Sequence, residues 1–248
     1  MKSRMNEYDT VNGKGVLVTG GTTGIGRATT LLLASQGARV FTFGRHKKEL
    51  KDAMRDFQEV GEVFGTIADS ARVAEVRRVF KEAEQKIGRI DILINNAALA
   101  AQGVTDTKVE ESEYVVQTNL LGYIACAQAA VGRMKKQKAG HIVNVGSMSA
   151  DVREKGSSVY VATKSGIQGF SEALRKEVNE LGIKVTLIEP GAVGTDMQPV
   201  SVPGQRKKEA AGEMLIAEDI ARCIYFCLTQ PARCDIVSLQ VRPHGQEI

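Results

Sequence analysis

Tryptophan is absent from this 248-residue chain, and all aromatic residues together make up only 5% of it. A surface that binds nucleic acid usually combines stacking aromatic side chains with a concentrated basic face. The net charge of +4 is small, and the lysines and arginines are scattered among acidic residues. We therefore expect no nucleic acid among the partners of this protein.

Long apolar runs and metal-binding cysteine patterns are also missing. No segment approaches the roughly 18 consecutive apolar residues of a membrane-spanning helix, so we expect no membrane segment. Residues 1–10 are polar and lack the apolar stretch of a secretory signal. The four cysteines form no C-x-x-C pair and have no histidine cluster nearby. We expect no metal site, and structural thiols in a reducing, cytoplasmic setting.

The chain alternates short apolar segments with longer amphipathic ones, which is typical of βαβ units. The expected strands cover residues 15–20, 39–44, 62–67, 91–94, 141–145, 184–188 and 235–241. The expected helices cover residues 25–36, 46–58, 71–87, 113–137, 159–181 and 217–228. This pattern predicts an α/β protein with one doubly wound, parallel, Rossmann-like sheet and helices on both faces. No linker or repeat divides the chain, so residues 1–248 are expected to form a single domain.

Residues 194–212 interrupt this alternation. They contain Pro199, Pro203 and the basic run Arg206-Lys207-Lys208, without a clear period. Loops of this length in compact domains usually have a function. We interpret this segment as a substrate lid within the domain.

A glycine-rich turn joins the first strand to the first helix. Gly20 permits a sharp turn, Gly24 allows close approach of a bulky anion, and Gly26 allows the helix to pack closely on the sheet. The free N–H groups at the start of the helix favour a pyrophosphate. The turn therefore predicts a dinucleotide site, and its further candidate residues are Thr22, Thr23 and Ile25.

The end of the second strand indicates which dinucleotide is bound. In folds of this kind an acidic residue there binds the ribose of NAD and repels the 2′-phosphate of NADP. Here Gly44 takes that position and Arg45 follows. A guanidinium is suited to bidentate phosphate binding, so we expect NADP(H) to be preferred over NAD(H). The alternative is that Arg45 only begins a solvated helix.

Several motifs together carry a family resemblance. Tyr160 and Lys164 form a Y-x-x-x-K pattern on an expected helix, and Ser147 lies 13 residues before the tyrosine at the end of a strand. Asn119 lies within the preceding long helix. Further motifs are Asn95-Asn96-Ala97, Pro190-Gly191 and Thr195. With the glycine turn, these residues resemble the short-chain dehydrogenase/reductase family over essentially the whole chain.

The resemblance implies a catalytic set of Asn119, Ser147, Tyr160 and Lys164. Tyr160 and Lys164 are four residues apart and share one helix face. An isolated tyrosine has a pKa of about 10, and the Lys164 ammonium and the positive nicotinamide of the oxidised cofactor are both expected to favour the phenolate. Tyr160 then exchanges a proton with the substrate oxygen, Ser147 orients that oxygen, and Asn119 anchors a water beside Lys164. The alternative for Asn119 is an ordinary exposed side chain.

The resemblance also implies a set of cofactor contacts besides those of the glycine turn. Asp69 meets the adenine amino group, although it would also serve as a plain helix N-cap. Tyr160 and Lys164 contact the cofactor as well. The remaining contacts are Asn95, Ala97, Pro190, Gly191, Val193 and Thr195.

The chain departs from the family pattern at two places. Ala98 stands where the family usually has glycine, and the C-terminus lacks the usual Asp-Gly-Gly. This ending is similar to that of the branch of NADP-dependent 3-hydroxy acid and serine dehydrogenases.

The sequence thus predicts an oxidoreductase that transfers a hydride between NADP(H) and a small carbonyl or alcohol substrate. The alternatives are a non-catalytic nucleotide sensor and an epimerase or dehydratase on the same fold. Apolar stripes on the helices at 113–137 and 159–181 indicate a homodimer or homotetramer.

Overall fold

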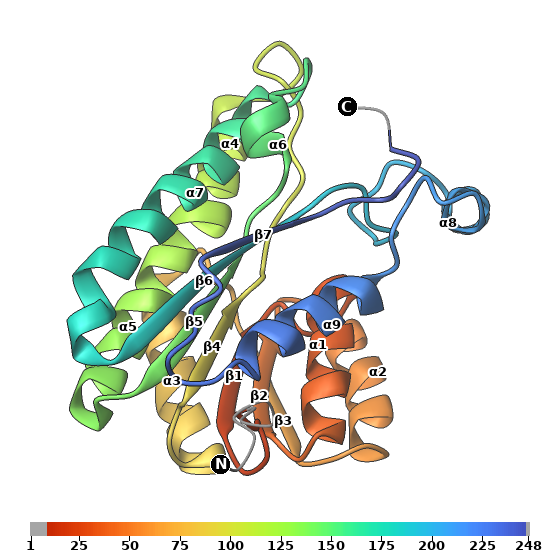
Figure 1. Cartoon of the computed structure of the whole chain (residues 1–248). Helices are drawn as coiled ribbons and strands as arrows, with labels where there is room; N and C mark the ends of the chain where they lie inside the picture. The colour runs from red at the N-terminus through yellow and green to blue at the C-terminus, as the bar shows by residue number, and fades with distance from the viewer. Residues whose placement is uncertain (1–8, 247–248) are drawn as a thin grey trace, which may run out of the picture.

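Residues 9–246, which the computed structural model describes, contain one sheet of seven parallel strands in the order β3-β2-β1-β4-β5-β6-β7 (Figure 1). The strands are β1 (Gly15–Thr19), β2 (Arg39–Gly44), β3 (Val63–Ile67), β4 (Ile92–Asn95), β5 (Gly140–Val145), β6 (Ile183–Pro190) and β7 (Ser238–Val241). All neighbouring pairs run parallel. The predicted parallel, Rossmann-like sheet is confirmed.

The central strands are buried on both faces, which explains their continuous apolar runs. Val16, Leu17 and Val18 of β1 are fully buried. Successive residues of a strand point to opposite faces, so these three contribute to two different cores. Val16 and Val18 join one apolar cluster, and Leu17 joins the other.

Six helices cover the two faces of the sheet. Leu33 of α1 (Gly24–Ser35), Phe57 of α2 (Lys47–Gln58) and Ile220 of α9 (Ala217–Leu228) belong to the first cluster. The other face carries α3 (Val73–Ile87), α5 (Gly122–Gln137) and α7 (Ser158–Val178), which contribute Phe80, Met134 and Leu174 to the second cluster. The expectation of helices on both faces is therefore also confirmed.

The expected helix at 113–137 is more complex than its sequence pattern suggested. It begins earlier as α4 (Val109–Val116), passes through a π-helical turn at Gln117–Leu121, and continues as α5. π-helical turns are rare and occur often at functional sites. The turn contains Asn119, one of the predicted catalytic residues.

Residues 194–212 are not simply a loop, because α8 (Val202–Ala210) forms within them. Pro203 stands in the first turn of this helix, where its missing N–H has no cost. The buried Gln205 side chain donates to the carbonyls of Thr195 and Val200, at 3.0 and 2.8 Å. In Figure 1, α8 projects to one side of the sheet. Its movement as a lid stays a prediction.

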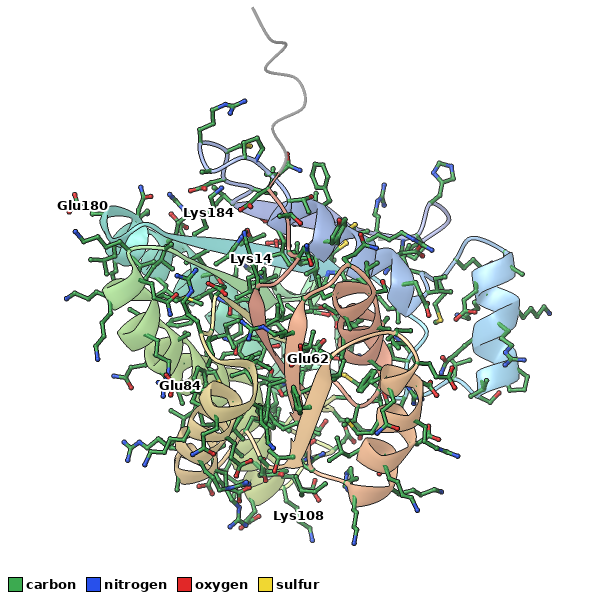
Figure 2. The ribbon with its side chains drawn as sticks, turned by 90° about the horizontal axis from the view of Figure 1, so that it is seen from below. Lys14, Glu62, Glu84, Lys108, Glu180 and Lys184 are labelled. Atoms are coloured by element: carbon green, nitrogen blue, oxygen red, sulfur yellow. The ribbon has the colours of Figure 1, made fainter. Side chains whose placement is uncertain are left out.

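Charged side chains of both signs are dispersed over the surface (Figure 2). Lys14, Glu62, Glu84 and Lys108, which are labelled in that view, come from different segments of the chain. None of the helices within residues 9–246 combines the length and apolar character needed to cross a membrane. Residues 1–8, the greater part of the polar segment 1–10, lie outside the described residues.

Candidate active site

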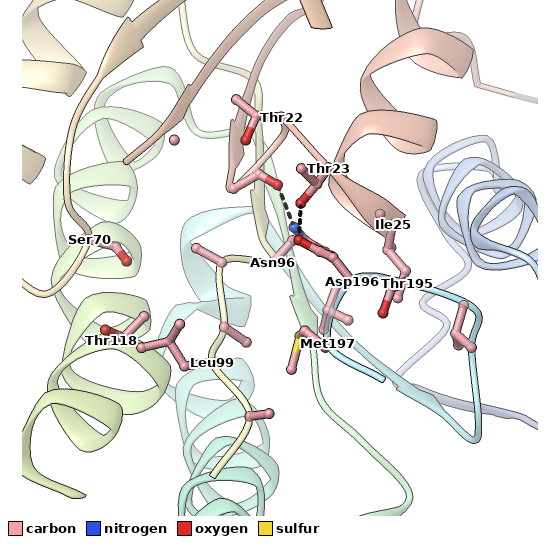
Figure 3. Close-up of a pocket in the computed structure, with 18 of the residues that line it drawn as sticks. Thr22, Thr23, Ile25, Ser70, Asn96, Leu99, Thr118, Thr195, Asp196 and Met197 are labelled. Atoms are coloured by element: carbon pink, nitrogen blue, oxygen red, sulfur yellow. Dashed lines mark hydrogen bonds between the residues drawn. The ribbon is translucent and has the colours of Figure 1, made fainter. Parts of the chain in front are cut away.

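A cleft of about 560 Å³ opens where the chain order of the strands reverses, between β1 and β4. In open α/β sheets, ligands bind beyond the carboxyl ends of the strands at this point. Figure 3 shows part of the wall, from Thr22 and Thr23 around to Ser70, Leu99 and Thr118. Most of the predicted site residues line this one cleft: Gly20, Thr22, Thr23, Gly24, Ile25, Arg45, Ala97, Ser147, Tyr160, Lys164, Pro190, Gly191, Val193 and Thr195.

The glycine turn is shaped by backbone packing. Gly20 has a φ of +65°, and a Cβ there would lie 2.8 Å from the Cα of Ala97. A Cβ on Gly26 would lie 2.2 Å from the Gly20 carbonyl oxygen, so this glycine packs the helix against the turn and does not line the cleft. Asn96 has no assigned role in the Asn95-Asn96-Ala97 motif. Its amide donates to the carbonyls of Thr19 and Gly20, and Asn96 itself lies in the cleft wall (Figure 3).

The start of α1 fits an anionic group. The first N–H groups of a helix have no partners within that helix, and the N-cap residue Thr23 provides no side-chain cap. The Thr23 hydroxyl donates instead to the Asp196 carboxylate, at 3.1 Å (Figure 3). Gly24, whose φ is +50°, keeps the approach to these N–H groups open. The residues present therefore fit the pyrophosphate of a dinucleotide.

Charged side chains of both signs line the cleft at the end of β2. Gly44, Arg45 and His46 line the cleft, and so does Glu49 from the first turn of α2. One carboxylate oxygen of Glu49 is buried without a hydrogen-bond partner among the described residues. A Cβ on Gly44 would approach the Thr22 hydroxyl to 2.6 Å. An acidic side chain at position 44 would therefore displace Thr22.

Arg45 and Asp69 are linked through Tyr114, a residue that sequence reasoning missed. Arg45 Nη1 donates to the Tyr114 hydroxyl at 2.7 Å, and this hydroxyl donates to Asp69 Oδ2 at 2.7 Å. Asp69 itself does not line the cleft, whereas its neighbours Ala68 and Ser70 do. Its other carboxylate oxygen accepts the Ala71 N–H at 2.9 Å. Asp69 is half-buried next to the cleft lining, and its implied contact with the adenine amino group stays a prediction.

Asn95 lies in the interior of the protein and does not line the cleft. It is fully buried, and its amide donates to the Tyr123 carbonyl and to Asn144 Oδ1, at 3.2 and 3.0 Å. These contacts tie β4 to β5 and α5. Asn95 thereby braces the central strands, and its implied contact with the cofactor stays a prediction.

Ser147, Tyr160 and Lys164 come together on the opposite wall. Ser147 follows β5 and accepts the Ser149 N–H at 3.1 Å, while Ser149 itself bonds Glu154 and stays outside the cleft. Burial raises the pKa of Tyr160, and its hydrogen bond with the Ser147 hydroxyl opposes this rise. Tyr160 is therefore held as a neutral acid that can donate a proton.

Lys164 is almost completely buried. Its ammonium donates to the Val145 carbonyl at 2.9 Å and lies 5.6 Å from the centre of the Tyr160 ring. Burial lowers the pKa of Lys164 to about 7. From the sequence, Lys164 and the oxidised nicotinamide are expected to lower the pKa of Tyr160 together. Among the described residues burial is the larger effect and the pKa of Tyr160 is raised, so the combined lowering stays a prediction.

Tyr123 is a second residue that sequence reasoning missed. Its buried hydroxyl donates to the same Val145 carbonyl, at 3.1 Å. The Lys164 ammonium lies 5.7 Å from the centre of its ring. Tyr123 follows Asn119 by four residues along the expected helix. Residues at this spacing lie on the same helix face, and this was the sequence signal that could have found Tyr123.

Asn119 is fully buried, so it is not an ordinary exposed side chain. Its amide donates to the Leu99 carbonyl at 2.8 Å and to the Thr163 hydroxyl at 3.3 Å, and its oxygen accepts the Leu99 N–H at 2.7 Å. Asn119 thereby links Leu99, a residue of the cleft wall, to Thr163 of α7. Its implied role of anchoring a water stays a prediction.

The family model described as short chain dehydrogenase matches residues 14–206. An uncharacterized oxidoreductase of Staphylococcus aureus (strain USA300) is 35% identical over 232 residues, covering 93% of this chain and 97% of the relative. An uncharacterized oxidoreductase of Staphylococcus epidermidis is 32% identical over 234 residues, covering 94% and 98%.

Two solved structures show the same fold. A short chain dehydrogenase from Burkholderia cenocepacia in complex with NADP has a TM-score of 0.83 and 27% identity, covering 95% of this chain and 98% of that one. Levodione reductase has a TM-score of 0.83 and 25% identity, covering 93% and 96%.

Proposed function

This chain belongs to the short-chain dehydrogenase family, and we propose that it transfers a hydride between NADP(H) and the carbonyl or alcohol carbon of a small substrate. The observation that carries the proposal is the common cleft. Ser147, Tyr160 and Lys164 line the same cleft as the glycine turn that precedes α1. A dinucleotide held at that turn would extend toward the tyrosine.

The proposed mechanism assigns a task to each residue. The nicotinamide supplies or accepts the hydride. Tyr160 gives its proton to the carbonyl oxygen during reduction and takes it back during alcohol oxidation. Ser147 holds the same oxygen by a hydrogen bond. Lys164, fixed on the Val145 carbonyl, provides a cation beside the phenol.

The preference for NADP(H) rests on the end of β2. No acidic residue stands at position 44, and Arg45 lines the cleft. A charge-assisted hydrogen bond contributes about 1.5–3 kcal/mol, and each 1.4 kcal/mol corresponds to roughly a factor of ten in affinity. Because Arg45 is exposed and Glu49 lines the same end, we expect the lower part of this range, about tenfold. The NADP-bound relative from Burkholderia cenocepacia supports this choice.

A panel of hydroxy acids, sugars, steroids and acyl thioesters, each assayed with both cofactors, tests the proposed function. We expect one class to be turned over, with cofactor consumed stoichiometrically and kcat/KM about tenfold higher for NADPH than for NADH. Cofactor binding without any turnover would instead identify a nucleotide sensor. Turnover without net cofactor consumption would identify an epimerase or dehydratase. Equal kcat/KM values for the two cofactors would contradict the NADP(H) assignment.

We also propose that the chain pairs with a second copy through α4, α5 and α7. Part of the apolar stripe expected on the helix at 159–181 is buried inside the subunit, since Ile167 and Leu174 belong to the cores. On the other helices Val109, Val116 and Ile124 are exposed, by 74, 41 and 37%. Val109 and Val116 belong to a largely apolar groove of about 480 Å³. Its lining residues are Val104, Thr107, Val109, Ser112, Val116, Ser158, Val159 and Ala162.

Light scattering at micromolar concentration checks this pairing. We expect the mass of a dimer or a tetramer, because burying these valines would remove a contiguous apolar patch from water. Val116→Lys should lower the mass without changing the circular dichroism. A wild-type mass of one chain would show that the groove is not an interface between copies.

A further inference from the structure

Tyr114 on α4 reaches the turn that follows β2 and contacts Arg45 there. These two residues are 69 positions apart in the sequence. The Arg45 guanidinium lies over the Tyr114 ring, 5.5 Å from its centre, and Nη1 donates to the phenolic oxygen at 2.7 Å. Ring and hydroxyl together fix both the position and the plane of the guanidinium.

The hydrogen bonds of this contact run in one direction. Arg45 donates to Tyr114, and Tyr114 donates to Asp69 Oδ2 at 2.7 Å. Asp69 Oδ1 accepts the Ala71 N–H, and the Asp69 N–H donates to Glu75. The phenolic oxygen is thereby held with its lone pairs toward Arg45. The backbone at Ala71 anchors the whole chain of bonds.

This arrangement leaves part of Arg45 available. Within residues 9–246, Nη2 and Nε of Arg45 make no hydrogen bond, and the side chain makes no ion pair. A guanidinium has five donors in a fixed plane. With Nη1 on Tyr114, the remaining edge can take a phosphate in two-point contact.

Glu49 provides a competing partner for Arg45. It follows Arg45 by four residues and lines the same end of the cleft. One of its carboxylate oxygens is buried without a partner among the described residues. A loosely held Arg45 would turn to this carboxylate, and the resulting pair would present no net positive charge to a phosphate.

We propose that Tyr114 is a positioning residue for cofactor choice, which orients the Arg45 guanidinium toward the 2′-phosphate of NADP(H) and away from Glu49. The inference rests on the proposed NADP(H) dependence. Tyr114 is not part of the cleft wall. Its hydroxyl should therefore influence only ligands that Arg45 recognises, and NADH offers no 2′-phosphate.

Tyr114→Phe tests this proposal because it removes the hydroxyl and keeps the ring. We expect KM for NADPH to rise about three- to tenfold, with kcat and the KM for NADH unchanged. Arg45→Ala should have a larger effect on NADPH, and adding Tyr114→Phe to it should change nothing further. Glu49→Gln in the Tyr114→Phe background should restore part of the NADPH affinity.

Calorimetry provides a readout that does not depend on turnover. Adenosine 2′,5′-bisphosphate carries the 2′-phosphate of NADP(H), and 5′-AMP lacks it. In Tyr114→Phe the Kd of the bisphosphate should rise by the same factor as the KM for NADPH, while that of 5′-AMP stays constant. Tyr225→Phe is the matched control, since its exposed hydroxyl bonds Gln36 on a distant surface.

The outcomes separate this inference from the proposed function. Equal kcat/KM for NADPH and NADH in the wild type would overturn the NADP(H) assignment and this inference with it. A wild-type preference that Arg45→Ala abolishes and Tyr114→Phe leaves intact would overturn only the role of Tyr114. Weakening of both probe nucleotides alike in Tyr114→Phe would make Tyr114 a general part of the adenosine site, and would also overturn the proposal.

Discussion

Tyr160→Phe should lower kcat by about 10²–10⁴-fold, the usual contribution of a positioned proton donor. The change removes only the hydroxyl that burial and Ser147 hold in the cleft. The ring remains, so the fold and the nucleotide site should survive. The measurement is kcat for any substrate found in the panel, together with the Kd of NADPH. Tyr225→Phe, at a half-buried position outside the cleft lining, is expected to leave both values unchanged.

The direction of the pH dependence follows from the raised pKa of Tyr160. Reduction needs the protonated phenol, so its rate should be maintained through neutral pH and fall as the pH rises through that pKa. Alcohol oxidation needs the phenolate and should increase over the same range. Both dependences should vanish in Tyr160→Phe. A variant that binds NADPH normally and keeps more than about a tenth of the wild-type kcat would show that Tyr160 is not the acid.

Lys164→Met should abolish turnover and make the protein more stable. The lysine is buried and its pKa is lowered to about 7, which means that burial disfavours its charged form. Methionine has a similar length and carries no charge. The Val145 carbonyl keeps a donor, because the Tyr123 hydroxyl also bonds it. Replacing a buried charge by an apolar residue of similar volume often stabilises by about 1–4 kcal/mol, and we expect a gain in that range at pH 7.

The stability gain of Lys164→Met should depend on pH. Below pH 7 the lysine is charged in both the folded and the unfolded state, so the folded wild type carries the full cost of the buried charge. Between this value and the unfolded pKa of about 10.4, only the unfolded state binds the proton, and wild-type stability rises with pH. Urea unfolding of both proteins should therefore show a difference in stability that is largest below pH 7 and shrinks as the pH rises from 7 toward 10.

Lys176→Met is the control for this experiment. Lys176 lies on the same helix, but its side chain is 62% exposed and pairs with Glu172. An exposed pair of this kind contributes little, so stability and turnover should both stay close to the wild-type values. An Lys164→Met variant that is less stable than the wild type, or that retains turnover, would contradict the roles given to this lysine.

The parts of this protein that depend on local patterns could be predicted from the amino-acid sequence. Buried strands of a parallel sheet need continuous apolar runs, and amphipathic helices need a regular period, so the order of elements could be read along the chain. The glycine turn and the Tyr160–Lys164 pair each occupy a few neighbouring residues. Their geometry follows from strand–turn–helix and helix spacing alone.

Which groups from distant parts of the chain meet depends on how the elements pack together. Arg45 and Tyr114 lie on different elements, and their contact depends on the strand order and on where α4 begins. The π-helical turn shifts the phase of the helix at Asn119, which an apolar period does not reveal. The side chains of Asp69 and Asn95 are bonded to Tyr114 and Asn144, residues that lie far from them in the sequence. The lowered pKa of Lys164 depends on burial, and burial is a property of packed elements, since no single segment can exclude water from a side chain.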